Sequence, residues 1–179
     1  MQALPNPSAH PYLLFLLFSM TEAISSQAPK KKLLLVSSSG GHLKHLTATS
    51  AAWQNYDRVW VSFKQPDVES SLADEKTYWA YYPTTRNIKN AIRNLFLAFR
   101  IFPKERPDAV VSAGAGVAVP FFVAAKLFGV KTLYIECFDR PTLPTMTGKM
   151  LYTFADRIIV QSEEQQENFP DSRVIHPIF

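Results

Sequence analysis

Short, continuous apolar runs alternate with helix-like segments from Lys30 onward, and this alternation constrains the fold more than any other feature. The apolar runs lie at residues 33–37 (LLLVS), 58–63, 77–82, 108–112, 131–135 (KTLYI), 157–160 (RIIV) and 173–175. An unbroken apolar run is typical of a strand buried on both faces, and strand–helix alternation favours a parallel sheet covered by helices. The sequence therefore predicts an α/β fold with a single Rossmann-like, doubly wound parallel sheet.

The segments between these runs carry helical signals. We expect helices at residues 43–53, 65–72, 87–102, 117–128 and 147–155, and a short helix capped by Ser162. The clearest is 87–102, where Ile88, Ile92, Leu95, Phe96, Phe99 and Phe102 recur at helical spacing. Pro103 and Pro107 are predicted to end it, because proline removes a backbone donor and clashes with the preceding turn.

The length of 179 residues and the 47% hydrophobic content suit one folded domain, which we place at residues 30–179. Residues 1–29 are predicted to be a variable tail with an apolar run at 12–20. That run is shorter than the roughly 20 residues a bilayer span needs. Three interpretations stay open: a shallow membrane anchor, a disordered tail, or an upstream extension with the true start at Met20.

The composition narrows the possible ligands. A net charge of +4 suits anionic lipids, phosphates or nucleic acid, but no stacking platform or known nucleic-acid motif occurs, so no nucleic-acid partner is predicted. The single cysteine, Cys137, rules out a disulfide within the chain and is interpreted as a small core residue. GxGxxG, Walker A and DxD motifs are all absent, so we predict no cofactor and no metal.

Two glycine turns each follow a predicted strand and precede a predicted helix. The turns supply Ser39, Gly40, Gly41, Gly114, Ala115 and Gly116. Helix N-termini favour anions, and the carboxyl ends of parallel strands share one edge of a sheet. We therefore predict that these residues bind a diphosphate, with an ordinary helix start or close helix–strand packing as the alternatives.

Two residues beside these turns are candidates for acid–base chemistry. His42 follows the first turn, and Glu136 follows the strand at 131–135. Both are predicted catalytic residues, since either could deprotonate a hydroxyl group. The alternatives are a capping or hydrogen-bonding histidine and a solvated or salt-bridged acid. His45 and Asp139 are interpreted as structural.

The helix at 87–102 also has a basic stripe beside its apolar residues. Lys89, Arg93, Phe96 and Arg100 are predicted to contact a membrane surface. The alternative is an ordinary core helix with a solvated, charged face.

Five stretches in one order resemble a known family. They are SSSGGHLKHL (37–46), PTTRNIKNAIRNL (83–95), PDAVVSAGAGVAVPFFVAAKLFG (107–129), YIECFDRPTLPTMTGKMLY (134–152) and ADRIIVQSEEQQENFP (155–170). The family is that of oligosaccharide-biosynthesis glycosyltransferase subunits. It includes the bacterial exopolysaccharide subunit PssD and the membrane subunit of the eukaryotic dolichol-diphosphate N-acetylglucosaminyltransferase.

This resemblance implies the N-terminal half of a MurG-type GT-B glycosyltransferase. The implied function is that of an acceptor-binding, membrane-associating subunit that is active only with a partner. The partner, equivalent to the C-terminal half, would hold a UDP-sugar, and the sugar would pass to a polyprenyl-diphosphate-linked saccharide. The implied location is the cytoplasmic face of the membrane, with peripheral or N-terminal attachment. Two alternatives remain: a non-catalytic scaffold that activates a separate enzyme, and a stand-alone Rossmann nucleotide enzyme, which the missing GxGxxG motif disfavours.

Overall fold

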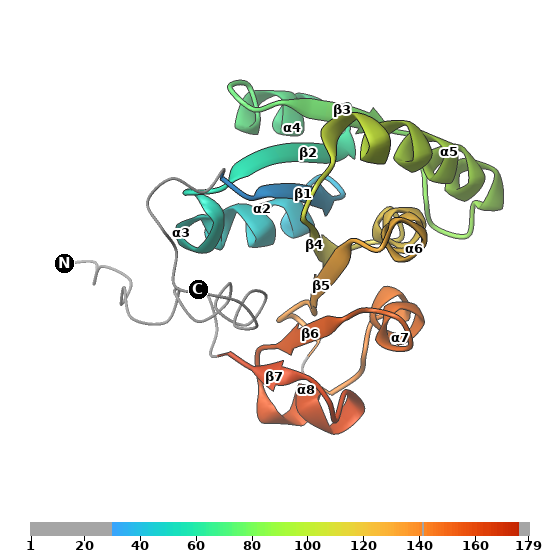
Figure 1. Cartoon of the computed structure of the whole chain (residues 1–179). Coiled ribbons are helices and arrows are strands. Elements are labelled where there is room, and N and C mark those ends of the chain that lie inside the picture. Colours follow the sequence, from blue (N-terminus) through green and yellow to red (C-terminus); the bar gives the residue numbers. More distant parts are fainter. Residues whose placement is uncertain (1–29, 141, 176–179) are drawn as a thin grey trace.

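The computed structural model describes residues 30–140 and 142–175, so the predicted tail and its apolar run lie outside the described residues. Seven parallel strands form one sheet in the order β3-β2-β1-β4-β5-β6-β7 (Figure 1). Their bounds are β1 (Lys32–Ser37), β2 (Asp57–Phe63), β3 (Thr77–Ala80), β4 (Ala109–Gly114), β5 (Lys131–Ile135), β6 (Arg157–Val160) and β7 (Arg173–Val174). The predicted α/β, Rossmann-like, doubly wound sheet is confirmed.

Helices cover both faces of this sheet (Figure 1). They are α2 (Gly41–Ala48), α3 (Ser50–Trp53), α4 (Pro66–Ser71), α5 (Ile88–Glu105), α6 (Ala118–Phe128), α7 (Met146–Tyr152) and α8 (Glu163–Asn168). In β1, Leu33 and Leu35 pack in one core cluster with α2, α3 and α4. Leu34 and Val36 pack in the other, with α5, α6 and α7. Alternate residues of a strand point to opposite faces, so a fully apolar strand fills both cores.

The order in which strands are added to the sheet reverses between β1 and β4. Strands β1, β2 and β3 run outward to one edge, and β4 to β7 run outward to the other. In open parallel sheets, ligands bind at such a switch point, beyond the carboxyl ends of the strands. Those ends here are the two glycine turns after β1 and β4.

Two helix predictions were wrong in detail, and the helix expected at 147–155 ends earlier, at Tyr152. The single helix expected at 43–53 is broken at Thr49 into α2 and α3, because the Thr49 hydroxyl donates to the Leu46 carbonyl and accepts from the Trp53 indole. The helix expected to stop before Pro103 continues through it to Glu105. Arg106 ends it in a left-handed conformation, with φ of 49°.

The first half of helix α5 faces inward with polar side chains, whereas its second half buries Ala98, Ile101 and Phe102. Asn94 is buried, its amide donates to the Tyr81 carbonyl, and its side-chain oxygen accepts from the Tyr81 N–H. Asn90 donates in the same way to the Pro83 carbonyl. These amides satisfy the backbone of the segment that follows β3, so the polar residues turn inward. Consequently Ile88 is 77% exposed and Phe96 is 66% exposed.

The end of α5 is held by a buried carboxylate, Glu105. Lys76 Nζ lies 2.7 Å from it, Lys32 Nζ lies 3.6 Å away, and the Tyr78 hydroxyl donates to it. Burial alone would raise the pKa of Glu105, but the hydrogen bonds from Lys76 and Tyr78 and the two lysine charges together lower it. The carboxylate therefore stays ionised and ties α5 to β1 and β3.

Candidate functional site

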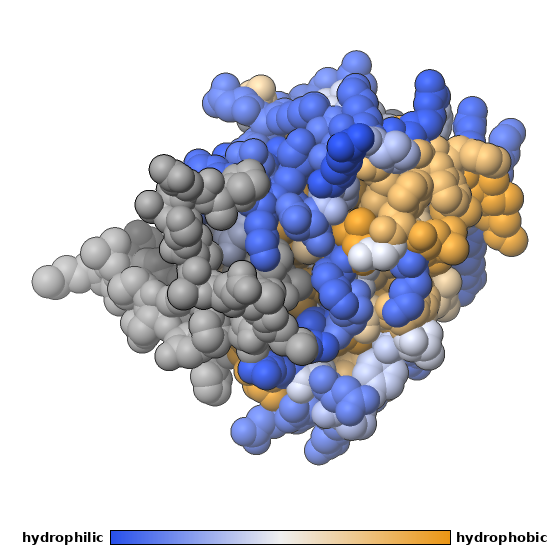
Figure 2. Space-filling model, viewed as in Figure 1, coloured by the Kyte–Doolittle hydropathy of each residue, from blue (hydrophilic) through white to orange (hydrophobic). Residues whose placement is uncertain are grey.

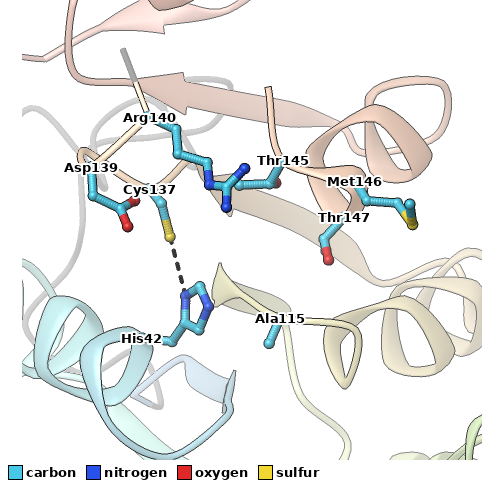
Figure 3. Close-up of a pocket in the computed structure, with 8 residues that line it drawn as sticks. All are labelled: His42, Ala115, Cys137, Asp139, Arg140, Thr145, Met146 and Thr147. Carbon is cyan, nitrogen blue, oxygen red and sulfur yellow. Dashed lines mark hydrogen bonds between the residues drawn. The ribbon is translucent and has the colours of Figure 1, made fainter. Parts of the chain in front are cut away.

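A cavity of about 320 Å³ opens at the carboxyl edge of the sheet, beside the switch point. Figure 3 shows its lining side chains, which converge from the start of α2, the β4–α6 turn, the loop after β5 and the start of α7. These residues are His42, Ala115, Cys137, Asp139, Arg140, Thr145, Met146 and Thr147. Elements far apart in the sequence therefore build one site.

The two glycine turns meet through His42. The Nδ1 atom of His42 lies 3.1 Å from the Ala113 carbonyl oxygen at the end of β4. The ring packs over Gly114, where an added Cβ would lie 3.0 Å from Nδ1, and the φ of 120° at Gly114 also favours glycine. The glycine thus gives His42 room to reach the cavity.

Of the six residues predicted to bind a diphosphate, only Ala115 lines the cavity. Ala115 lines it, with a left-handed φ of 58°, a conformation that is uncommon outside functional turns. Ser39, Gly40, Gly41, Gly114 and Gly116 are not among the lining residues. The Gly40 N–H donates to Asp67 Oδ2 at 3.2 Å, so a carboxylate already occupies the donor that a phosphate would use.

Glu136 is fully buried and does not line the cavity. Its carboxylate accepts from the Thr145 hydroxyl and from the Cys137 N–H, each at 3.1 Å. Burial raises the pKa of Glu136, and the hydrogen bonds oppose this only in part. In this arrangement the carboxylate holds the loop after β5 against the start of α7 rather than facing a substrate.

Thr145 caps α7 and is the link between Glu136 and the cavity. Its hydroxyl accepts from the Gly148 N–H at 2.9 Å and lies 3.1 Å from the Tyr134 hydroxyl. An N-cap threonine satisfies one of the free N–H groups that begin a helix. The cap fixes where Met146 and Thr147 stand in the cavity wall.

Sequence reasoning missed several lining residues. Arg140, Thr145, Met146 and Thr147 were not predicted, and Asp139, interpreted as structural, also lines the cavity. The spacing of Thr145 and Gly148 was the available signal, since threonine three residues before a buried helical position is a typical N-cap.

Cys137 is buried, as its interpretation as a core residue requires, yet it also borders the cavity. Its Sγ lies 3.1 Å from His42 Nδ1, the contact drawn as a dashed line in Figure 3. Burial, together with the Glu136 and Asp139 charges, raises the pKa of Cys137 to about 12. The side chain therefore stays a thiol and is a poor nucleophile.

His45 has the structural role expected of it. It is buried, and its Nε2 lies 2.9 Å from the Gln161 amide nitrogen, which also donates to the Glu136 carbonyl. Burial lowers the pKa of His45 to about 4, with a smaller contribution from His42. The neutral ring can accept from Gln161 and so joins α2 to the ends of β5 and β6.

An apolar surface lies over α5 and α6. It consists of the exposed side chains of Ile88, Ile92, Phe96, Phe99, Val123, Leu127 and Phe128. Figure 2 shows apolar residues gathered on the side of the molecule where these helices lie, bordered by hydrophilic ones. The predicted membrane contacts Lys89, Arg93, Phe96 and Arg100 are all exposed on α5. Within residues 30–140 and 142–175, no helix combines the length and hydropathy that crossing a bilayer demands.

Comparison with known proteins places this site in context. Residues 33–178 match the family described as "Oligosaccharide biosynthesis protein Alg14 like". The chain is 27% identical over 171 residues to human UDP-N-acetylglucosamine transferase subunit ALG14, covering 78% of this chain and 79% of the human protein. It is 24% identical over 156 residues to the Staphylococcus aureus UDP-N-acetylglucosamine–N-acetylmuramyl-(pentapeptide) pyrophosphoryl-undecaprenol N-acetylglucosamine transferase. That match covers 75% of this chain but only 42% of the bacterial enzyme.

Solved structures agree on the fold. Acinetobacter baumannii MurG superposes with a TM-score of 0.63 at 21% identity, over 76% of this chain and 43% of MurG. The S. aureus MnaA–UDP complex gives the same TM-score at 12% identity, over 80% of this chain and 43% of MnaA. The chain thus has the fold of the N-terminal half of a GT-B glycosyltransferase and spans less than half the length of these solved proteins. With the family match across most of its length, the chain belongs to the Alg14-like oligosaccharide biosynthesis proteins.

Proposed function

We propose that this chain is the acceptor-binding, membrane-associating subunit of a two-component glycosyltransferase. The pair would transfer a sugar from a UDP-sugar to a lipid-diphosphate-linked saccharide. The observation that carries the proposal is the cavity with His42 at the carboxyl edge of the sheet, on the same domain as an exposed apolar surface. The human relative, matched over 79% of its length, is named a transferase subunit, which supports a separate donor-binding partner.

His42 is suited to act as the general base. The Ala113 carbonyl can only accept a hydrogen bond, so the tautomer that satisfies it carries the proton on Nδ1 and keeps the lone pair on Nε2. Figure 3 shows the second ring nitrogen turned toward the side of the cavity where Ala115 lies. That nitrogen would take the acceptor hydroxyl proton while the oxygen bonds to sugar C1 and the C1–O bond to UDP breaks with inversion.

The test is reconstitution with a candidate donor-binding chain. We expect the co-purified pair to transfer sugar from one of UDP-N-acetylglucosamine, UDP-glucuronate or UDP-galactose to a polyprenyl-diphosphate-linked saccharide, measured with radiolabelled donor. Each chain alone should give no product, because acceptor and donor sites lie on different polypeptides. Sustained transfer by this chain alone would contradict the proposal, and transfer by the partner alone would favour the scaffold alternative.

Membrane association is expected to depend on the apolar surface. Phe96→Asp should lower binding to anionic phospholipid vesicles about tenfold or more, because one buried phenylalanine contributes about 1.5–3 kcal/mol and the new charge repels the bilayer. Sedimentation with vesicles measures the effect. Ser70→Asp is the control, since it adds the same charge on exposed α4, across the sheet from α5. Unchanged vesicle binding by Phe96→Asp would exclude this face as the contact.

A further inference from the structure

The cavity wall carries a hydroxyl and a cation, on Thr147 and Arg140, that have no partner among the residues the structure describes. Thr147 is 9% exposed, lines the cavity, and its hydroxyl has no hydrogen-bond partner in the part of the chain that the structure describes. Arg140 is exposed and lines the same cavity, and its guanidinium forms no ion pair among residues 30–140 and 142–175. A hydroxyl that faces a cavity is available to donate to a ligand, and arginine favours oxyanions, so both groups suit a bound anion.

The glycine turns are less suitable for that anion. Asp67 already accepts from the Gly40 N–H, and its charge would repel a diphosphate. At the second turn, the His42 ring covers Gly114, so only Ala115 borders the cavity. The positions open to a phosphate are therefore on the opposite wall, in the loop after β5 and at the start of α7.

On the basis of the proposed function, we infer that Arg140 and Thr147 bind the diphosphate of the lipid-linked acceptor. A guanidinium can donate two parallel hydrogen bonds to phosphate oxygens, and the Thr147 hydroxyl can donate a third. In Figure 3 the guanidinium extends toward Thr145, whereas the Asp139 carboxylate lies on the Cys137 side. The cavity is thereby divided into a phosphate end near Thr147 and a sugar end near His42 and Asp139.

Direct binding to the isolated full chain tests this inference. Farnesyl diphosphate, a short soluble prenyl diphosphate, is titrated into the wild type, Arg140→Gln and Thr147→Val and followed by calorimetry. We expect affinity to fall about tenfold or more for Arg140→Gln and about fivefold for Thr147→Val, since hydrogen bonds to charged groups are the stronger ones. Arg157→Gln removes the same charge at the amino end of β6 and should bind as the wild type does.

Two ligand arms identify the source of the phosphate. Farnesol should not bind measurably, and UDP should bind more weakly than farnesyl diphosphate, because the nucleotide-sugar is assigned to the partner. Tighter binding of UDP, no binding of farnesyl diphosphate to the wild type, or unchanged affinity in both variants would each overturn the inference. Thermal unfolding of each variant confirms that it is folded.

The proposed function is tested separately, by the transfer assay. If the reconstituted pair transfers sugar normally with either variant, only the assignment of Arg140 and Thr147 is refuted, and the proposed function stands.

Discussion

Replacing His42 with alanine is expected to lower the turnover of the reconstituted pair by about 10²–10⁴-fold, the usual contribution of a positioned general base. His42 lines the cavity, and its contact with the Ala113 carbonyl leaves Nε2 able to accept a proton. The Michaelis constant for the acceptor should change little, because the ring acts on the reacting hydroxyl rather than on the diphosphate. Steady-state transfer assays with a saturating UDP-sugar measure both constants.

Lys44→Ala is the matched control for this change. Lys44 lies on the exposed side of the same helix, so its loss should leave turnover within about twofold, as is usual for surface substitutions. Added imidazole should restore part of the His42→Ala activity by supplying the missing base. Nearly normal turnover of His42→Ala would contradict the base assignment and favour the scaffold alternative.

The fold could be read from the sequence because the strands are defined by local composition. All seven predicted strands occur, with ends that differ by at most two residues. Runs such as LLLVS and KTLYI are apolar on both faces, and only a strand between two helical layers buries both. The break at Thr49 was not predictable from helical spacing, because it depends on the Trp53 indole reaching back to the threonine.

The orientation of α5 shows the limit of pattern reasoning. Its apolar periodicity was evident, and such a stripe usually faces the core. Here Asn90 and Asn94 face inward, because the chain after β3 needs partners for its backbone groups. The sequence fixes only that two different faces exist, and long-range contacts decide which one is buried. The exposure of Phe96 and of its basic neighbours on α5 supports the proposed contact with a membrane surface.

The candidate site was predicted at its strand ends but not at its far wall. His42 and Ala115 follow strands directly, so topology places them at one edge of the sheet. Arg140 and Thr147 belong to a loop and a short helix whose position depends on Glu136. A buried glutamate that accepts from Thr145 has no local sequence signature, which is why it was predicted to be a catalytic group.

The packing of α7 on Glu136 leads to the second large effect, at Gly148. An added Cβ at Gly148 would overlap Glu136 Oε2 and lie 3.0 Å from the Phe169 ring. Gly148→Ala should therefore lower the free energy of unfolding by about 3 kcal/mol, at the upper end for an overpacked core, and the melting temperature by about 10 °C. Chemical and thermal denaturation followed by circular dichroism measure these quantities.

Gly41→Ala provides the opposite control. Gly41 begins α2 with nothing within 4 Å of an added Cβ, so alanine there should leave stability unchanged or raise it by up to about 1 kcal/mol. In the double variant Glu136→Ala/Gly148→Ala, the obstructing carboxylate is gone, and the combined loss should be smaller than the sum of the single losses. Additive losses, or a Gly148→Ala protein as stable as the wild type, would mean that α7 does not rest on Glu136. In that case the Thr145 cap and the buried carboxylate would not be what holds the wall that carries Thr147 beside His42.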